Sequence, residues 1–209
     1  MKLKEQTNLC NICLEENNKI NLIYLFNKEN ICCLQCIQKK NAQFIKYKIH
    51  GVECLSIYLY NDELKQLIYR LKGCYDIELA KSFLYPYLRE LKLFYKSFNL
   101  VPIPSNSKDD QVRGFNHVLE IFKCLNLPIL QILEKKNNVK QSDRNFNQRQ
   151  LIIYDLKVND LERIENKNIL IVDDICTTGN TLKAVISLLK EGKPKKIKVL
   201  TICIVQKKI

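Results

Sequence analysis

The pattern of apolar and polar residues predicts strands and helices in alternation. Four consecutive aliphatic residues, Ile169–Val172, are typical of a strand that is buried on both faces of a parallel sheet. Strands are also predicted at Cys54–Tyr60, Phe98–Ile103, Ile129–Leu133 and Val199–Val205. This order indicates an α/β fold built on a parallel sheet, in which ligands bind at the carboxyl ends of the strands.

Apolar residues at helical spacing predict the helices. The first helix follows Asn61–Asp62 and ends at Gly73, and a longer one over 80–91 should be kinked or restarted at Pro86. Two more are expected, one opening at Arg113-Gly-Phe-Asn116 and one after residue 181. Their apolar faces are Leu64, Leu67, Ile68 and Leu71; Val118, Ile121, Phe122 and Leu125; and Leu182, Val185, Ile186 and Leu189.

The stretch 169–182 combines a strand, a small-residue turn and a helix start. The strand is expected to stop at Asp173 and Asp174, whose carboxylates can accept hydrogen bonds from adjacent sugar hydroxyls. The turn that follows offers free backbone N–H groups, a glycine for close approach and hydroxyl donors, all suited to a phosphate. Its residues are Thr177, Thr178, Gly179, Asn180 and Thr181. A diol site beside a phosphate site implies a ribose 5-phosphate.

This stretch resembles the phosphoribosyl-pyrophosphate signature of type I phosphoribosyltransferases. The resemblance implies that Asp173 and Asp174 bind the ribose hydroxyls and that Thr177–Thr181 holds the 5-phosphate. An aliphatic strand ending in two aspartates also occurs in nucleotidases with a Walker B segment. The five glycines of this chain form no G-x-x-x-x-G-K-[ST] loop, which excludes that interpretation.

Four of the ten cysteines have the spacing of a zinc ribbon. Cys10-x-x-Cys13 and Cys33-x-x-Cys36 are separated by residues 14–32, close to the ~15–20 residues expected. Paired thiolates at this spacing occupy adjacent corners of a tetrahedral zinc site. Cys32 competes as a ligand through its spacing to Cys36. We therefore expect a structural Zn²⁺ in an N-terminal module (1–48), followed by an α/β domain (49–209).

Charge and hydropathy narrow the class of partner. The formal net charge is +12 at pH 7, which favours polyanionic partners, although a lysine-rich composition alone could produce it. No run approaches the ~18 apolar residues of a membrane span, and the first residues lack the apolar core of a signal peptide. A cytoplasmic location is expected.

Residues 134–150 contain almost nothing apolar. A segment this long is either a solvated linker or functional. Three of the six arginines, Arg113, Arg144 and Arg149, lie between residues 113 and 149, and arginine suits phosphate. Together with Lys140 they are the predicted contacts to DNA or phosphate.

Over essentially its whole length the chain resembles the ComF family, phosphoribosyltransferase-like proteins of bacterial DNA uptake. The blocks that carry this are the four-cysteine ribbon, Tyr60 to Lys72-Gly73, Val101-Pro-Ile-Pro with Arg113-Gly-Phe-Asn116, the aspartate signature and, more loosely, Gln141, Arg144 and Asn147. His117 stands where the family more often has glutamine. The resemblance implies a role in natural transformation, handling incoming single-stranded DNA with helicase-type partners.

Two classes of function remain open. The first is a DNA-handling competence factor that retains a phosphoribosyl-pyrophosphate site. The second is an active phosphoribosyltransferase, using Mg²⁺ and a diphosphate loop of Pro104, Ser105 and Ser107 to serve an unidentified acceptor. We favour the first, because the sequence offers no base-selecting hood and no obvious general base. The two histidines, His50 and His117, are expected to be structural.

Overall fold

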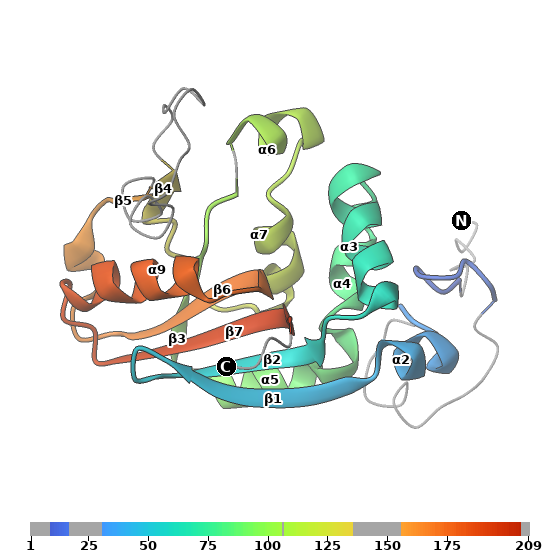
Figure 1. Cartoon of the computed structure of the whole chain (residues 1–209), viewed down its shortest axis with the longest axis horizontal. Coiled ribbons are helices and arrows are strands. Elements are labelled where there is room, and N and C mark those ends of the chain that lie inside the picture. Colours follow the sequence, from blue (N-terminus) through green and yellow to red (C-terminus); the bar gives the residue numbers. More distant parts are fainter. Residues whose placement is uncertain (1–8, 17–30, 106, 136–155, 206–209) are drawn as a thin grey trace, which may run out of the picture.

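The computed structural model describes residues 9–16, 31–105, 107–135 and 156–205. Its centre is a five-stranded sheet with the order β1-β2-β7-β6-β3 (Figure 1). The strands are β1 (Ala42–Ile49), β2 (Val52–Leu59), β3 (Phe98–Pro102), β6 (Asn168–Cys176) and β7 (Lys196–Ile204). β1 pairs antiparallel with β2, and the other neighbours pair parallel, so the expected α/β fold with a mostly parallel sheet is confirmed.

Alternating residues of β6 enter two separate cores, as expected for a strand buried on both faces. Leu170 and Val172 pack in the core that includes α3 (Asp62–Gly73), α4 (Leu79–Ser82), α5 (Leu88–Tyr95) and α7 (His117–Phe122). Ile169 and Ile171 pack in the other core with α9 (Asn180–Lys190). Side chains that follow on β6 therefore reach opposite faces of the sheet.

Shorter elements complete the described chain. A two-stranded antiparallel ribbon, β4 (Leu133–Lys135) and β5 (Leu156–Val158), borders residues 136–155, which lie outside the described residues. The remaining helices are α2 (Leu34–Lys40) and α6 (Ser107–Arg113), with single 3₁₀ turns at Tyr85–Tyr87, Lys123–Leu125 and Leu161–Ile164. Among the described residues no helix is both long and apolar enough to cross a membrane.

The N-terminal segment packs directly on this core. Cys10, Ile12, Ile31, Cys32, Cys36 and Ile37 belong to the same buried cluster as α3, α4, α5 and α7. β1, which lies almost entirely within the expected module of residues 1–48, is the edge strand of the main sheet. The division of the chain into two domains stays a prediction.

The structure corrects several predicted boundaries. β6 continues through both aspartates to Cys176, because its backbone stays paired with β7 as far as Ile204. The helix expected over 80–91 is interrupted at Pro86 as predicted, with this residue in the 3₁₀ turn between α4 and α5. In place of a strand at 129–133, Ile129 makes one bridge to Leu100, and β4 begins at Leu133. Arg113 ends α6, and Asn116 caps α7. The predicted helix α3 is confirmed, although Gly73 is its last residue and Cys74 its cap.

Candidate functional site

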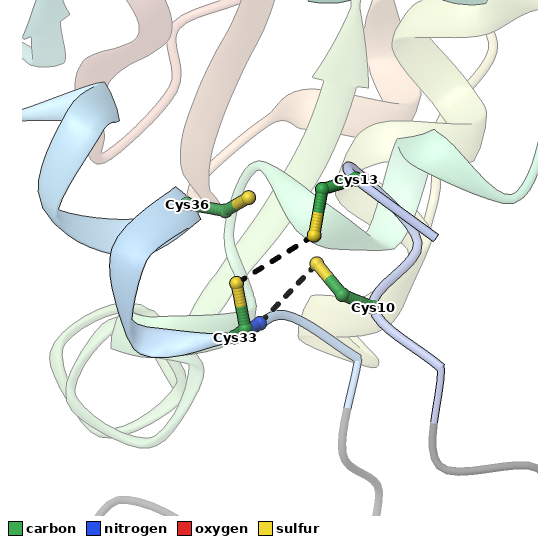
Figure 2. Close-up of side chains that lie close together, drawn as sticks. All are labelled: Cys10, Cys13, Cys33 and Cys36. Carbon is green, nitrogen blue, oxygen red and sulfur yellow. Dashed lines mark hydrogen bonds between the residues drawn. The ribbon is translucent and has the colours of Figure 1, made fainter. Parts of the chain in front are cut away.

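Cys10, Cys13, Cys33 and Cys36 come together at the N-terminal end of the described chain (Figure 2). Their four Sγ atoms lie within 4.8 Å of one another. The Sγ atoms of Cys13 and Cys33 are 3.8 Å apart. A tetrahedral zinc with Zn–S bonds of about 2.3 Å requires S–S separations of about 3.8 Å. The cluster therefore fits a metal ion such as zinc, in both donor type and spacing.

Backbone N–H groups favour the thiolate form of Cys10. The N–H of Cys33 donates to Cys10 Sγ at 3.3 Å. Burial alone would raise the pKa of the Cys10 thiol, but hydrogen bonds from the backbone at Cys13, Cys33 and Ile12 lower that pKa to about 7. A thiol that ionises near neutral pH is ready to act as a metal ligand.

The competition between Cys32 and Cys33 is decided by geometry. Cys33 belongs to the cluster, whereas Cys32 is buried and its Sγ lies 3.9 Å from the carbonyl oxygen of Ser82. Lys40, which is only 1% exposed, donates from Nζ to the same carbonyl. Cys32 therefore belongs to the packing between α2 and α4, apart from the metal cluster.

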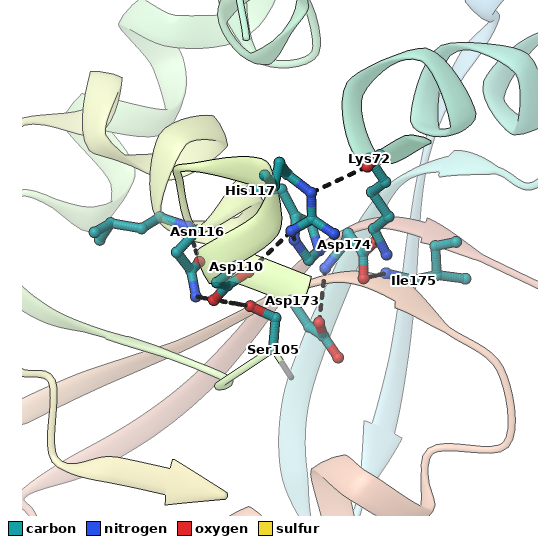
Figure 3. Close-up of polar contacts among 10 residues, drawn as sticks. Lys72, Ser105, Asp110, Asn116, His117, Asp173, Asp174 and Ile175 are labelled. Carbon is teal, nitrogen blue, oxygen red and sulfur yellow. Dashed lines mark hydrogen bonds and ion pairs between the residues drawn. The ribbon is translucent and has the colours of Figure 1, made fainter. Parts of the chain in front are cut away.

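A second group of polar residues lies at the carboxyl ends of β3 and β6 (Figure 3). Asp174 lies on the side of β6 where α3 and α7 pack, beside Lys72 and His117. Asp173 lines the same pocket, but its carboxylate points away from Lys72 and His117 (Figure 3). Each side chain curls back on the strand, because the N–H of Asp174 donates to Asp173 Oδ1 at 2.9 Å and that of Ile175 to Asp174 Oδ1 at 2.8 Å.

Asp174 is held by two cationic or polar side chains from different helices. Lys72, near the end of α3, forms an ion pair with Asp174 Oδ2. His117, the first residue of α7, places Nε2 3.4 Å from the same oxygen. Burial opposes ionisation of Asp174, but the hydrogen bond from His117 and the charge of Lys72 outweigh it, and the pKa of Asp174 is lowered. Asp174 is therefore held in place in its ionised form.

Asp173 has the opposite electrostatic environment. Burial and then the adjacent charge of Asp174 raise the pKa of Asp173 well above its ordinary value. Among the described residues it takes part in no ion pair. A carboxylate that is costly to ionise in the empty protein gains most from a ligand that supplies hydroxyl donors or a cation.

Arg113 joins these helices to the loop after β3. Its Nη1 lies 2.9 Å from Asp110 Oδ1 and 3.2 Å from His117 Nδ1, while Nε donates to the carbonyl oxygen of Lys72 at 3.1 Å. Asp110 in turn accepts from Ser105, and Asn116 Nδ2 donates to both Asp110 and Ser105 at 2.9 Å (Figure 3). The side chain of Arg113 is only 7% exposed, and its predicted contact with DNA or phosphate stays a prediction.

These groups line a pocket of about 260 Å³. The predicted residues Asp173, Asp174, Pro104 and Ser105 all contribute to its walls. Lys72, Arg113 and Lys135 add positive charge, and the other lining residues are Ile103, Asp109, His117 and Val118. Ser107 is the first residue of α6, and its side chain lies outside what the structure describes, as do Lys140, Arg144 and Arg149. Carboxylates and cationic side chains thus share one cavity.

The turn after β6 is built as expected but does not line the pocket. Thr177 and Thr178 are exposed, and the N–H of Asn180 donates to Thr178 Oγ1 at 3.4 Å. Gly179 caps α9 with φ +71°, a conformation that favours glycine. A Cβ there would lie 2.9 Å from Ile49 Cδ1, so the close packing of the turn on β1 also needs glycine. The turn is held at the same end of β6 as the pocket.

Comparison with known proteins gives the family. The chain is 36% identical over 152 residues to Competence protein ComFC of Bacillus subtilis (strain 168), covering 70% of this chain and 62% of that protein. It is 33% identical over 148 residues to ComFC of Streptococcus pneumoniae, covering 71% of this chain and 66% of the relative. Residues 112–208 match the family model for the phosphoribosyl transferase domain. The chain belongs to the ComF family. It spans less than two thirds of the length of either relative.

Two further matches are more limited. A stretch of 53 residues is 43% identical to hypoxanthine-guanine phosphoribosyltransferase of Canis lupus familiaris, covering 24% of each chain. Among solved structures, the purine phosphoribosyltransferase from Pyrococcus horikoshii has 18% identity and a TM-score of 0.39, over 60% of this chain and 73% of that chain.

Several residues of the pocket were not predicted as site residues. Lys72 was identified only as part of the helix end, His117 only as a structural residue, and Asp109 was given no role. Lys72-Gly73 and Arg113-Gly-Phe-Asn116 stand in two of the blocks that resemble the ComF family. Their sequence positions gave no sign that the ends of α3 and α7 meet at Asp174.

Proposed function

We propose that this ComF-family protein acts in natural transformation, handling incoming single-stranded DNA on a phosphoribosyltransferase scaffold with helicase-type partners. Its pocket is proposed to bind phosphoribosyl pyrophosphate or a similar ribose 5-phosphate. The similarity to two competence proteins supports the first part, together with a net charge of +12, because a basic protein attracts polyanions. No catalytic turnover is required by this proposal.

The ligand proposal rests on one observation: negatively and positively charged side chains line the same cavity. Asp173 and Asp174 would accept hydrogen bonds from the ribose hydroxyls, while Lys72, Arg113 and Lys135 supply positive charge for phosphate. The turn Thr177–Thr181, at the N-terminus of α9, is proposed to hold the 5-phosphate, and Pro104 with Ser105 the diphosphate side.

Mg²⁺ is proposed to accompany the diphosphate. It prefers oxygen ligands and usually binds through one or two carboxylates together with substrate phosphates. Asp173 is the better of the two carboxylates for this task, since Asp174 is already neutralised by Lys72 and His117. When bound, the cation would offset the diphosphate charge.

In the N-terminal cluster we propose a structural Zn²⁺ on Cys10, Cys13, Cys33 and Cys36. A closed set of four thiolates leaves no open position for a substrate, which is typical of structural rather than catalytic zinc. Its contribution would be to fix the N-terminal segment on α3 and α4.

An active phosphoribosyltransferase is the second candidate. The match to the phosphoribosyl transferase domain over 112–208 favours it, as does the raised pKa of Asp173, the direction that a general base requires. His117 is a poor alternative base, because its ring lies between Asp174 and Arg113. Release of diphosphate from phosphoribosyl pyrophosphate, with a panel of purine and pyrimidine bases, would support this candidate.

The DNA proposal is tested by titrating a labelled single-stranded oligonucleotide against the full chain and following anisotropy. We expect binding with little sequence preference that weakens as salt increases. A duplex of the same sequence is the control. Preference for the duplex, or no binding to either, would contradict a role in handling single strands.

A further inference from the structure

A second pocket lies far from the carboxylates, on the face of the sheet that α5 covers. Its volume is about 400 Å³. Among its walls are Glu53 and Leu55 of β2 and Lys198 of β7, from the amino-terminal halves of these strands. The candidate site described above lies at the carboxyl end of the sheet instead. Neither the family signature nor the predicted DNA contacts include any of these residues.

Positive charge gathers at this pocket from two strands. Lys48 on β1 stands opposite Glu53 on β2, which in turn stands opposite Lys198 on β7. Lys46 is two residues before Lys48 and therefore shares its face. Glu53 is the acidic residue of the lining, and it is paired with Lys198 at 3.2 Å. Because Glu53 is paired with Lys198, the positive charges of the exposed Lys46 and Lys48 remain available to bind an anionic ligand.

An exposed aromatic ring completes the pocket. Phe94, near the end of α5, is 60% exposed, although a phenylalanine usually buries its ring. Lys198 Nζ lies 4.5 Å from its ring centroid, and the buried Tyr95 contacts it edge-on at 4.9 Å. The ring is thereby held on a rigid support with a face available to solvent. We call Lys46, Lys48, Glu53, Phe94 and Lys198 the Phe94 patch.

Protection of an exposed sheet edge does not explain this arrangement. Lysines on an edge strand commonly discourage pairing with other chains, and β1 is an edge strand. Phe94 is on a helix, however, and Lys198 is on β7, between β2 and β6. An exposed ring with cations around it is the combination that binds single-stranded nucleic acid, by stacking bases and pairing phosphates.

We propose that the Phe94 patch binds a segment of single-stranded DNA, with one base stacked on Phe94 and the flanking phosphates paired with Lys46 and Lys48. This rests on the proposed DNA-handling function and gives it a location apart from the ribose-phosphate pocket. The protein would then hold a strand on one part of its surface and a ribose phosphate on another.

The absence of tryptophan from the chain allows a direct test. Phe94→Trp places a single tryptophan in the patch, and Tyr69→Trp places a single tryptophan on α3 at a position that is 66% exposed. Single-stranded oligonucleotide should quench the first variant in step with binding measured by anisotropy, and leave the second unchanged. Equal quenching of both, or quenching of neither while the strand binds, overturns the patch but leaves the proposed function standing.

Affinity measurements provide a second test of the Phe94 patch. Phe94→Ala should weaken single-strand binding by about 5- to 100-fold, as expected for the loss of one stacked base, whereas Leu93→Ala on the same helix, 70% exposed, should not. Lys46→Ala with Lys48→Ala should flatten the slope of log K against log salt by about 1.4, and the exposed pair Lys65→Ala with Lys81→Ala should leave it unchanged.

Three results of these measurements would overturn the proposal. A free mononucleotide that quenches Phe94→Trp at the same concentration as the oligonucleotide would assign the patch to nucleotides. Equal competition by polyglutamate would show a general polyanion surface. No binding of single strands to the unaltered protein would overturn both the patch and the proposed function.

Discussion

Asp173 and Asp174 are adjacent in the chain, yet their carboxylates point in different directions (Figure 3) and their pKa values shift in opposite directions. Asp174 lies beside α3 and α7, where Lys72 and His117 hold it as a carboxylate. At Asp173, burial and the charge of its neighbour oppose ionisation. One residue is therefore structurally satisfied and the other depends on a ligand.

This difference predicts opposite effects of two isosteric substitutions on stability. Asp174→Asn should lower the free energy of unfolding by about 2–3 kcal/mol, less than for a fully buried pair because Lys72 is partly exposed. Asp173→Asn removes a costly buried charge and should raise stability by about 1 kcal/mol at neutral pH. Urea unfolding of both variants measures this. A loss of similar size in both would contradict the asymmetry.

The pH dependence of the Asp174 effect follows from the sign of its shift. Because its pKa is lower in the folded protein than its ordinary value of 3.8, the carboxylate stabilises the fold above that value. This contribution is lost as the pH falls below 3.8 towards the folded-state pKa. The stability difference between the unaltered protein and Asp174→Asn should therefore shrink on acidification. A difference that grows towards low pH would contradict the assignment of Asp174 as the charged member.

The four-cysteine cluster predicts about one zinc ion per chain. Cys10→Ser should release the metal and destabilise the N-terminal segment, because metal binding and folding are coupled in such sites. Cys32→Ser is the matched control, since Cys32 lies beside Ser82 and outside the cluster. Metal content measured on the purified variants decides between them. Release of zinc by Cys32→Ser, with retention by Cys33→Ser, would reverse the ligand assignment.

The basic segment of residues 134–150 gives a prediction that rests on its sequence alone. Replacing Arg144 and Arg149 together by alanine should reduce the salt slope of single-strand binding by about 1.4. Lys195→Ala with Lys196→Ala, an exposed pair at the start of β7, is an equally charged control. Binding isotherms at several salt concentrations measure both slopes. Equal effects of the two pairs would show that bulk basicity, rather than this segment, binds the strand.

Local patterns predicted much of the fold and part of the site. The aliphatic run before Asp173 identified β6, and the stripe after Asn61 identified α3, because burial and capping depend on nearby residues. The Cys-x-x-Cys pairs likewise predicted the cluster, since their spacing fixes the geometry of the donors. Each of these signals depends on residues that lie close to one another in the sequence.

What the sequence did not predict depends on contacts between distant segments. Lys72 and His117 meet at Asp174 only because α3 and α7 pack on the same face of β6. The partners of Arg113 could not be predicted either, because the tertiary fold places its guanidinium between Asp110, His117 and the carbonyl of Lys72. The choice between Cys32 and Cys33 also required the position of α4, which carries Ser82.

Binding of phosphoribosyl pyrophosphate with Mg²⁺, measured by calorimetry on the full chain, tests the central claim most directly. We expect saturable binding that Asp173→Ala with Asp174→Ala abolishes while circular dichroism shows an intact fold. Thr178→Val, similar in volume but without the hydroxyl, should weaken binding by about 1–3 kcal/mol. Unchanged binding in all of these variants, or no binding to the unaltered protein, would contradict a ribose-phosphate site at the end of β6.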